Sequence, residues 1–394
     1  MPGAAARTAL FRAAPLPAIL ALAACAAPAS PRLPASAYAP IPADAEERPA
    51  TDDGWPDVSE FLKKKYGFLP VPILITEPAV GYGLGGGLAF ISEPLVKDDG
   101  FNRPNISFVG GFRTENDSQG GVIGDVRYWM EDRLQTVAAV IRSSVNLDFH
   151  GVGDVLGNNP LEYNIQPEGG FLQGKYRLGD TRLWAGASFA YARAEVEFEA
   201  PASAAGIPDF ARTTHVGGLT PSLTWDTRDN VLTPIRGAYV EGGVGLYAPV
   251  FGADTEYQRA RLLAMQFTPL GSDLYLGVRG QAASTFGDPP FYLQPFIDLR
   301  GVPKLRYQGE TTAEIEAELR WQFWGRLSAV GFVGAGSAWN DFDRVENRQS
   351  VVSGGTGFRY ELAREHGIHV GLDVAFADGD TAIYIQIGSA WARP

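Results

Sequence analysis

The sequence predicts an all-β fold: a transmembrane antiparallel β-barrel of about sixteen strands with one loop folded into its interior. Three observations predict it. Segments of about ten residues, separated by turn residues, follow one another from Val71 to Trp391. Several of these segments alternate apolar and polar residues, which is the period of a strand with two different faces. The N-terminus has the pattern of an export signal.

Residues 1–25 form the predicted export signal. Arg7 and Arg12 precede an apolar stretch, Ala13 to Ala24, that is too short to span a membrane as a helix. The stretch ends in Leu22-Ala23-Ala24-Cys25, which resembles the lipobox of bacterial lipoproteins, so Cys25 is a candidate for lipidation. The alternative is an ordinary cleavage site. Because Cys25 is the only cysteine, no disulfide is possible within the chain.

Residues 26–66 precede the predicted barrel, which covers 67–394. The first part of this segment is rich in Pro, Ala and acidic residues and predicts a disordered tether. The stretch Pro56 to Tyr66 has the length of one or two helical turns. Its run of three lysines, 63–65, is either a solvated face or a contact for anionic lipid head groups.

The strands are expected to be antiparallel, because no helical segment long enough for a parallel crossover lies between them. Aromatic residues near strand ends are typical of a membrane-interface girdle. The connections 146–167, 198–211 and 286–310 are long and others are tight, as in outer-membrane barrels. The expected strands are 71–76, 79–91, 104–113, 121–130, 134–145, 168–178, 182–197, 212–226, 236–247, 256–268, 273–285, 311–323, 327–339, 351–362, 368–377 and 380–391. The expected girdle residues are Trp129, Trp225, Tyr247, Trp321, Trp324, Trp339 and Trp391.

The stretch from Asp298 to Trp324 joins a basic loop to a regular strand. The loop carries Arg300, Lys304 and Arg306, and the strand carries Glu314, Glu316 and Glu318 on its polar face. Opposite charges on adjacent segments predict that the loop folds back onto that face, which would line the interior of a barrel. The alternative for the three glutamates is a merely hydrated lining.

Composition excludes several classes of function. The net charge of −12 argues against nucleic-acid binding, which needs a basic surface. Four His and one Cys leave almost no ligands for a metal site, and no cofactor or catalytic residue is predicted. A barrel phospholipase would need a serine beside a histidine. The histidines, in predicted loops or at strand ends without such a serine, are His150, His215, His366 and His369.

Five motifs in order resemble the bacterial surface-antigen barrel family, the BamA/TamA-type outer-membrane proteins. They are LPVPILITEPAVGYGLGGG from Leu69 to Gly87, FHGVGD from Phe149 to Asp154, WDTRDNVLTPIRG from Trp225 to Gly237, Leu299-Arg300-Gly301, and YIQIGSAW from Tyr384 to Trp391. Together they cover about residues 67 to 391. The turn motif contributes Asp226, Arg228, Asp229 and Gly237, and the terminal strand signal contributes Tyr384, Ile387, Gly388 and Trp391.

The resemblance implies a sixteen-stranded barrel whose sixth loop enters the lumen through its Arg-Gly pair. Carried over, Arg300 and Gly301 form that pair and Glu318 is the carboxylate partner, since a guanidinium inside a barrel needs a carboxylate. The sequence departs from the family at Val302, where an aromatic residue is usual, and at Gly334, where the family has an aspartate.

The resemblance also implies first and last strands that pair poorly and leave a lateral seam. Both strands are weakened here, the first pair by Pro and Gly and the last by Gly388-Ser389. The residues before the barrel are too few and too rich in Pro and Ala for the periplasmic polypeptide-transport-associated domains of assembly and secretion proteins. The expected function is therefore help with protein or lipid insertion or translocation at the bacterial outer membrane, with a separate periplasmic partner.

The alternative is a passive pore or structural barrel. In either case we expect a monomeric barrel in outer-membrane lipid, with no enzymatic activity and no nucleic acid bound.

Overall fold

The computed structural model describes residues 53–59, 67–77, 79–91, 96–97, 100–101, 105–149, 161–198, 210–340, 348–364 and 367–391. The chain divides into two units, Met1–Glu47 and Arg48–Pro394, and every described residue belongs to the second. The predicted export signal with Cys25, residues 60–66 of the predicted helical segment with its three lysines, and residues 150–154 of the FHGVGD motif lie outside the described residues.

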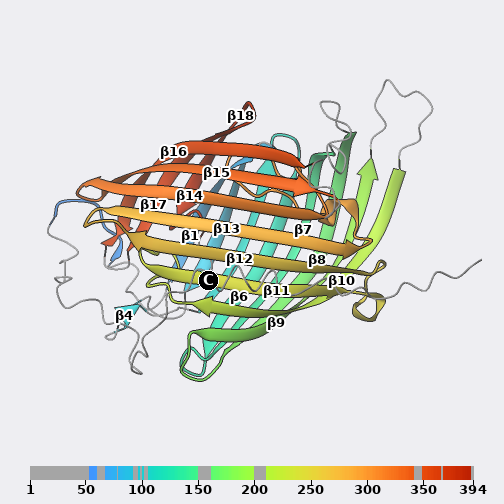
Figure 1. Ribbon diagram of the computed structural model, residues 1–394, viewed down its shortest axis with the longest axis horizontal. Helices are drawn as coiled ribbons and strands as arrows, with labels where there is room; N and C mark the ends of the chain where they lie inside the picture. Colours follow the sequence, from blue (N-terminus) through green and yellow to red (C-terminus); the bar gives the residue numbers. More distant parts are fainter. Residues whose placement is uncertain are drawn as a thin grey trace, which may run out of the picture. The chain divides into compact units, whose positions relative to one another are not determined.

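Sixteen strands form one antiparallel sheet in which each strand pairs with its neighbours along the chain (Figure 1). The two further strands, β3 and β4, form a small separate hairpin. The strands are β1 (Gly67–Glu77), β2 (Gly81–Ile91), β3 (Val96–Lys97), β4 (Gly100–Phe101), β5 (Ile106–Thr114), β6 (Gln119–Trp129), β7 (Leu134–Phe149), β8 (Leu161–Arg177), β9 (Leu183–Phe198), β10 (Phe210–Asp226), β11 (Gly237–Tyr247), β12 (Tyr257–Pro269), β13 (Leu274–Gly287), β14 (Thr311–Trp324), β15 (Leu327–Trp339), β16 (Gln349–Ala363), β17 (Ile368–Ala377) and β18 (Asp380–Ile387).

Two short 3-10 helices lie in loops: η1 (Pro249–Phe251) and η2 (Phe291–Leu293). No helix in the described part of the chain is long and apolar enough to cross a membrane.

The predicted fold class and the number of strands in the sheet are confirmed. Four boundaries differ by four residues or more: β1 begins at Gly67 rather than 71, β7 ends at Phe149 rather than 145, and the other two concern β8 and the last strand. β8 begins at Leu161 rather than near 168, because residues such as Tyr163 and Ile165 have ladder partners on both β7 and β9 despite their weak alternation. The last strand ends at Ile387 rather than at Trp391, because Gly388 has a φ of 82° and turns the chain away from the sheet.

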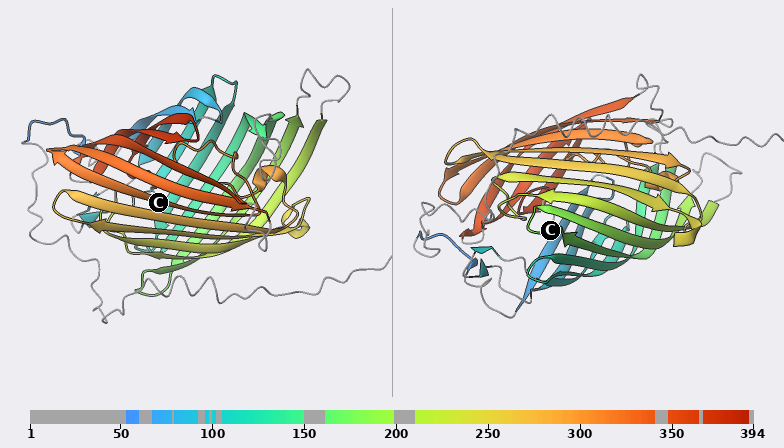
Figure 2. Two further views of the ribbon diagram at one scale, coloured as in Figure 1. Left: turned by 45° about the horizontal axis from the view of Figure 1, so that its top comes forward. Right: turned by 60° about the horizontal axis from the view of Figure 1, so that its bottom comes forward.

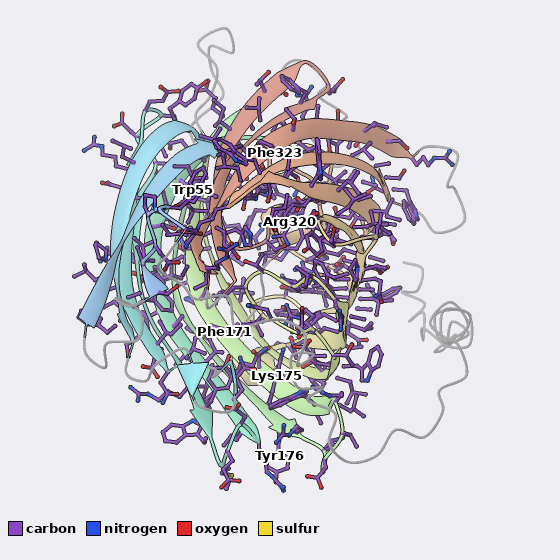
Figure 3. The ribbon with its side chains drawn as sticks, turned by 90° about the vertical axis from the view of Figure 1, so that its left-hand side faces the viewer. Trp55, Phe171, Lys175, Tyr176, Arg320 and Phe323 are labelled. Carbon is purple, nitrogen blue, oxygen red and sulfur yellow. The ribbon has the colours of Figure 1, made fainter. Side chains whose placement is uncertain are left out.

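The two faces of the sheet have opposite character. On β14 the outward residues Ile315 and Trp321 are each 55% exposed, whereas Glu316 on the other face is 1% exposed. Figure 3 looks along the interior of the curled sheet: Arg320 lies inside it, and Lys175 is buried while its neighbour Tyr176 is exposed. A sheet that is polar within and apolar outside is the reverse of a soluble protein and typical of a membrane barrel.

The connections differ from the expected separation of short turns from long loops. On one side of the sheet most connections are short, such as 130–133 and 325–326. Three longer ones, 150–160, 199–209 and 288–310, lie on the opposite side, but the 14-residue connection between β2 and β5, 92–105, lies on the side of the short turns. Short turns also occur on the side of the three longer connections, at 78–80, 115–118 and 378–379.

Candidate functional site: an inward loop, the chain end and the closure

The connection between β13 and β14 packs inside the sheet. Ile297, Leu299 and Val302 of this loop are each at most 1% exposed. They form a cluster with Ala338, Val351 and Ala377, which belong to β15, β16 and β17. Two glycines of β15 make room for the loop. A Cβ atom on Gly334 would lie 2.9 Å from Leu299, and one on Gly336 would lie 2.7 Å from Ile297. The departure at Gly334 therefore has a structural reason.

Arg300 lies among three carboxylates at the centre of this packing. Its Nε donates to Glu316 Oε1 at 2.6 Å, and its Nη1 lies 2.7 Å from Glu318 Oε2 and 2.8 Å from Asp373 Oδ2. The guanidinium also lies over the Phe332 ring, 3.6 Å from its centroid. Several charged hydrogen bonds and a cation–π contact offset the cost of removing this cation from water.

Asp373 on β17 is the partner that sequence reasoning did not identify. It is fully buried and also accepts from Arg359 of β16, whose Nη1 and Nη2 lie 2.5 Å and 2.9 Å from its two oxygens. Asp373, on the second strand beyond the one that carries Gly334, thus supplies Arg300 with a carboxylate. Its place on the polar face of a clearly alternating strand was the one available signal.

Gly301 needs to be glycine for two reasons. Its φ of 89° is in the left-handed region. An added Cβ would also lie 3.1 Å from the backbone nitrogen of Phe376. The Gly301 N–H donates to the Tyr384 hydroxyl on β18 at 3.0 Å, so the loop contacts the last strand as well.

The end of the chain turns into the interior instead of completing the last strand. Trp391, predicted as a girdle residue, is 5% exposed and packs on Tyr239, Met265 and Phe267. Its Nε1 donates to Glu316 Oε2 at 2.8 Å, so the chain end and Arg300 share one carboxylate. The girdle prediction is therefore wrong for Trp391. Four other members of the predicted girdle are exposed on the outer face: Trp129, Trp225, Trp321 and Trp324.

The connection between β10 and β11 is stabilised by its own hydrogen bonds and also binds the chain end. Arg228 donates to Asp226 through Nε and Nη2, both at 2.9 Å, and Asp229 Oδ1 accepts from the backbone of Ile235 at 3.1 Å. Gly237 has a φ of 96°, and an added Cβ would lie 2.2 Å from the Thr227 carbonyl oxygen. The Leu232 carbonyl, within the same turn, accepts from the Ser389 N–H at 2.6 Å.

The sheet is not closed by a ladder between its first and last strands. Cα atoms of β1 and β18 approach within 8 Å, and the views in Figure 2 show the sheet curling toward closure. Among the described strands, however, β1 pairs only with β2 and β18 only with β17. β18 is also short, with 8 residues, whereas interior strands such as β8 have 17.

A cavity of about 370 Å³ lies beside this closure. The inward loop, β12, β13, β18 and the chain end form its walls. Charged and polar groups line it, including Arg279, Lys304 and Gln386.

The histidines in the described part of the chain do not form the serine pair that a phospholipase would need. His215 Nδ1 lies 3.3 Å from Asp254, and His369 Nδ1 lies 3.0 Å from the Gly367 carbonyl oxygen. Neither of these contacts involves a serine.

The fold and this site define a class: a β-barrel of the outer-membrane type with a loop anchored in its interior and no hydrogen-bonded ladder between the described parts of its first and last strands. Residues 187–378 match the Omp85 superfamily domain. The chain therefore carries an Omp85 superfamily domain in a BamA-type barrel, and the resemblance inferred from the sequence is confirmed.

Solved structures of the same fold include BamA from Haemophilus ducreyi lacking POTRA domains 1–3 (13% identity, TM-score 0.53, covering 82% of this chain and 70% of that one). They also include CdiB from Escherichia coli (11%, 0.58, 81% and 61%) and CdiB from Acinetobacter baumannii (9%, 0.52, 82% and 60%). The chain thus spans less than two thirds of either CdiB chain. A search of curated protein sequences finds no match.

Proposed function

We propose that this protein is a bacterial outer-membrane barrel that assists the insertion or translocation of protein or lipid, together with a separate periplasmic partner. The unzipped closure between β1 and β18 is the observation that carries the proposal. A barrel removes its sheet edges only when its first and last strands pair fully. Here two strand edges remain available for a client strand or for lateral passage into the bilayer.

The inward loop supports the same function. Arg300 joins it to β14 and β17, Asp373 in turn accepts from Arg359 of β16, and Gly301 reaches β18. Among the described residues, the contacts of Arg300 therefore lie on the β18 side of the closure. In this proposal Arg300, Gly301 and Glu318 hold the loop, while the turn motif and the terminal strand hold the chain end.

The test is a disulfide across the closure in a Cys25→Ser background. One cysteine replaces Ile75 of β1, and the second is moved along β18 to find its opposite position. The matched control joins Leu372→Cys to Ile385→Cys, which are paired across the β17–β18 ladder and both exposed. The readout is assisted insertion of a urea-denatured outer-membrane barrel into vesicles containing this protein and a periplasmic extract.

We expect the closure disulfide to abolish assistance and the control disulfide to leave it unchanged, with both barrels folded. Equal activity of the two disulfide variants would reject the proposal. So would amide exchange in β1 and β18 as slow as in β12 and β13, because the closure would then be fully paired.

A passive pore is the second candidate, favoured by the polar cavity beside the loop. Conductance in planar bilayers separates the two functions. A steady open current supports a pore, whereas a blocked and flickering current supports a plugged barrel with a movable closure.

A further inference from the structure

Residues 53–59, just before the barrel, lie on the rim formed by the β14–β15 and β16–β17 turns. Arg326 of the first turn is fully buried beneath them. It donates to both oxygens of Asp53, through Nε at 2.7 Å and Nη2 at 3.0 Å, and its Nη1 lies 2.5 Å from Asp57 Oδ2. Arg364 of the second turn adds a 2.8 Å pair with Asp53. A guanidinium that uses three of its nitrogens on two carboxylates is a specific anchor rather than a loose surface pair.

Aromatic and backbone contacts complete the docking. The ring of Trp55 meets that of Trp324 edge-on, with centroids 5.3 Å apart, and Figure 3 shows Trp55 beside the end of β14 that carries Phe323. The Val58 N–H donates to the Leu362 carbonyl at 3.0 Å, and the Tyr360 hydroxyl donates to the Pro56 carbonyl. We call residues 53–59 the rim strap.

The rim strap contacts the β18 side of the closure, whereas the strand that follows it in the chain, β1, forms the other side. Its contacts lie on the β14–β17 wall, and β18 comes next in the sheet. Ser59 precedes Gly67, the first residue of β1, by eight positions. The seven residues between them link the strap covalently to β1, so a restraint on Ser59 limits how far Gly67 can move from the β14–β17 wall.

The strap also shares a support with the end of β18. Val58 and Leu232 both pack against the buried pair Ala363 and Ile368. The Leu232 carbonyl accepts from Ser389, two residues after the end of β18. Movement of the strap would therefore loosen the packing that positions the chain beyond β18.

We propose that the rim strap is a clasp that restrains the closure at the Gly67 end of β1, and that its release loosens β1 from β18. This inference deepens the proposed function, because it names the contact that regulates the closure. The chemistry that would release it is a competing acidic and aromatic peptide segment from the periplasmic partner, able to take Arg326 and Trp324 from the strap.

The test compares amide exchange in the full-length protein with that of a released and a locked variant, measured in lipid nanodiscs. The released variant combines Asp53→Asn, Trp55→Ala and Asp57→Asn, all outside the barrel strands. The locked variant joins Val58→Cys to Leu362→Cys in a Cys25→Ser background. Asp117→Asn, which removes an exposed ion pair with Arg113 on a distant turn, is the matched control.

We expect exchange at the Gly67 end of β1 and in β18 to become at least fivefold faster on release and slower on locking, with the control unchanged. Equal exchange in parent and released protein would overturn the clasp. Acceleration that is as large in β12 and β13 would also overturn it, since the strap would then act on the whole barrel.

The two proposals fail separately. If amide exchange in β1 and β18 of the parent is as slow as in interior strands, the proposed function fails. The ratio of the exchange rates in the released variant and the parent still decides whether the strap restrains these strands.

Discussion

The Arg300 guanidinium makes the most deeply buried ionic contacts of the inward loop. Arg300 faces Glu316, Glu318 and Asp373 in a space with almost no exposure, where isolated charges are costly. Two of these carboxylates have a second partner, which offsets the cost of their burial: Glu316 also accepts from Trp391, and Asp373 also accepts from Arg359. The arrangement makes the loop, three strands and the chain end depend on one another.

Arg300→Ala should destabilise the folded barrel by about 3–5 kcal/mol, because it leaves buried carboxylates without their cation. Arg300→Lys should cost less, since an ammonium group retains the charge and loses the forked geometry. The measurements are the urea midpoint of the heat-modifiable band and the rate of protease cleavage in the β13–β14 loop. Midpoints and cleavage rates unchanged from the parent would show that the loop is held by its apolar cluster alone.

Trp391→Phe should cost about 1.5–3 kcal/mol, because it keeps most of the ring packing and removes the hydrogen bond to a buried charged Glu316. Trp321→Phe is the matched control, since Trp321 is exposed on the outer face of β14. Urea unfolding of both variants measures the difference. A Trp391→Phe protein as stable as the control would mean that the chain end contributes packing only.

At the scale of the elements, the sequence predicted the number of strands and most of their boundaries, but few of the contacts between distant segments. Alternation is a local property, so strands such as β14 and β17 could be predicted within a residue or two. The folding of the basic loop onto the glutamates was expected from adjacent segments, and the family resemblance implied Glu318 as the partner of Arg300. Asp373 could not be assigned, because its distance from Arg300 depends on how the whole sheet curls.

The chain end and the rim strap were missed for a related reason. From the sequence, Gly388 was expected to weaken the last strand without ending it. Its left-handed conformation, with a φ of 82°, shows that the strand stops there. The strap crosses from the predicted tether into the segment expected to form helical turns, and its position is set by long-range pairs such as Asp53 with Arg326. Local composition carries no information about such partners.

The strap should detach in acid. The hydrogen bond from Arg326 keeps the pKa of Asp53 below its ordinary value. Burial acts to raise the pKa of Asp57, but hydrogen bonds from Ser59 and Arg326 outweigh it and lower that pKa to about 2. A depressed carboxyl pKa stabilises docking fully above the ordinary value of 3.8, and the stabilisation is lost as the pH falls from there through about 2.

A nitroxide label on Pro56→Cys, in a Cys25→Ser background, reports this by electron paramagnetic resonance. We expect an immobile label at pH 6 that becomes mobile between about pH 4 and pH 2. Arg326→Gln should give a mobile label at every pH. A label that stays immobile in Arg326→Gln would assign the docking to the aromatic contacts.

At the scale of the whole molecule, lipidation of Cys25 is a hypothesis that can be tested separately from the barrel assignment. Cys25 follows Leu22-Ala23-Ala24 and is the only thiol in the chain. Radiolabelled palmitate should therefore enter the parent protein and not Cys25→Ser. Equal labelling of the two, or labelling of neither, would reject lipidation and leave the barrel assignment intact.

The distribution of apolar and charged residues over the sheet predicts where the protein resides. Large apolar side chains such as Ile123, Leu172 and Val352 are more than half exposed on the outside, while arginines and glutamates are buried within. That outer surface has no favourable contact in water, because burying apolar area contributes roughly 25 cal/mol per Å². We therefore expect the protein to fractionate with outer membranes and to migrate differently on gels before and after boiling. Its sheet would remain folded in the unboiled sample, since almost every strand is hydrogen-bonded on both sides. Recovery of the protein as a soluble periplasmic species with a single gel mobility would contradict the barrel, because the exposed apolar face would then require some other cover.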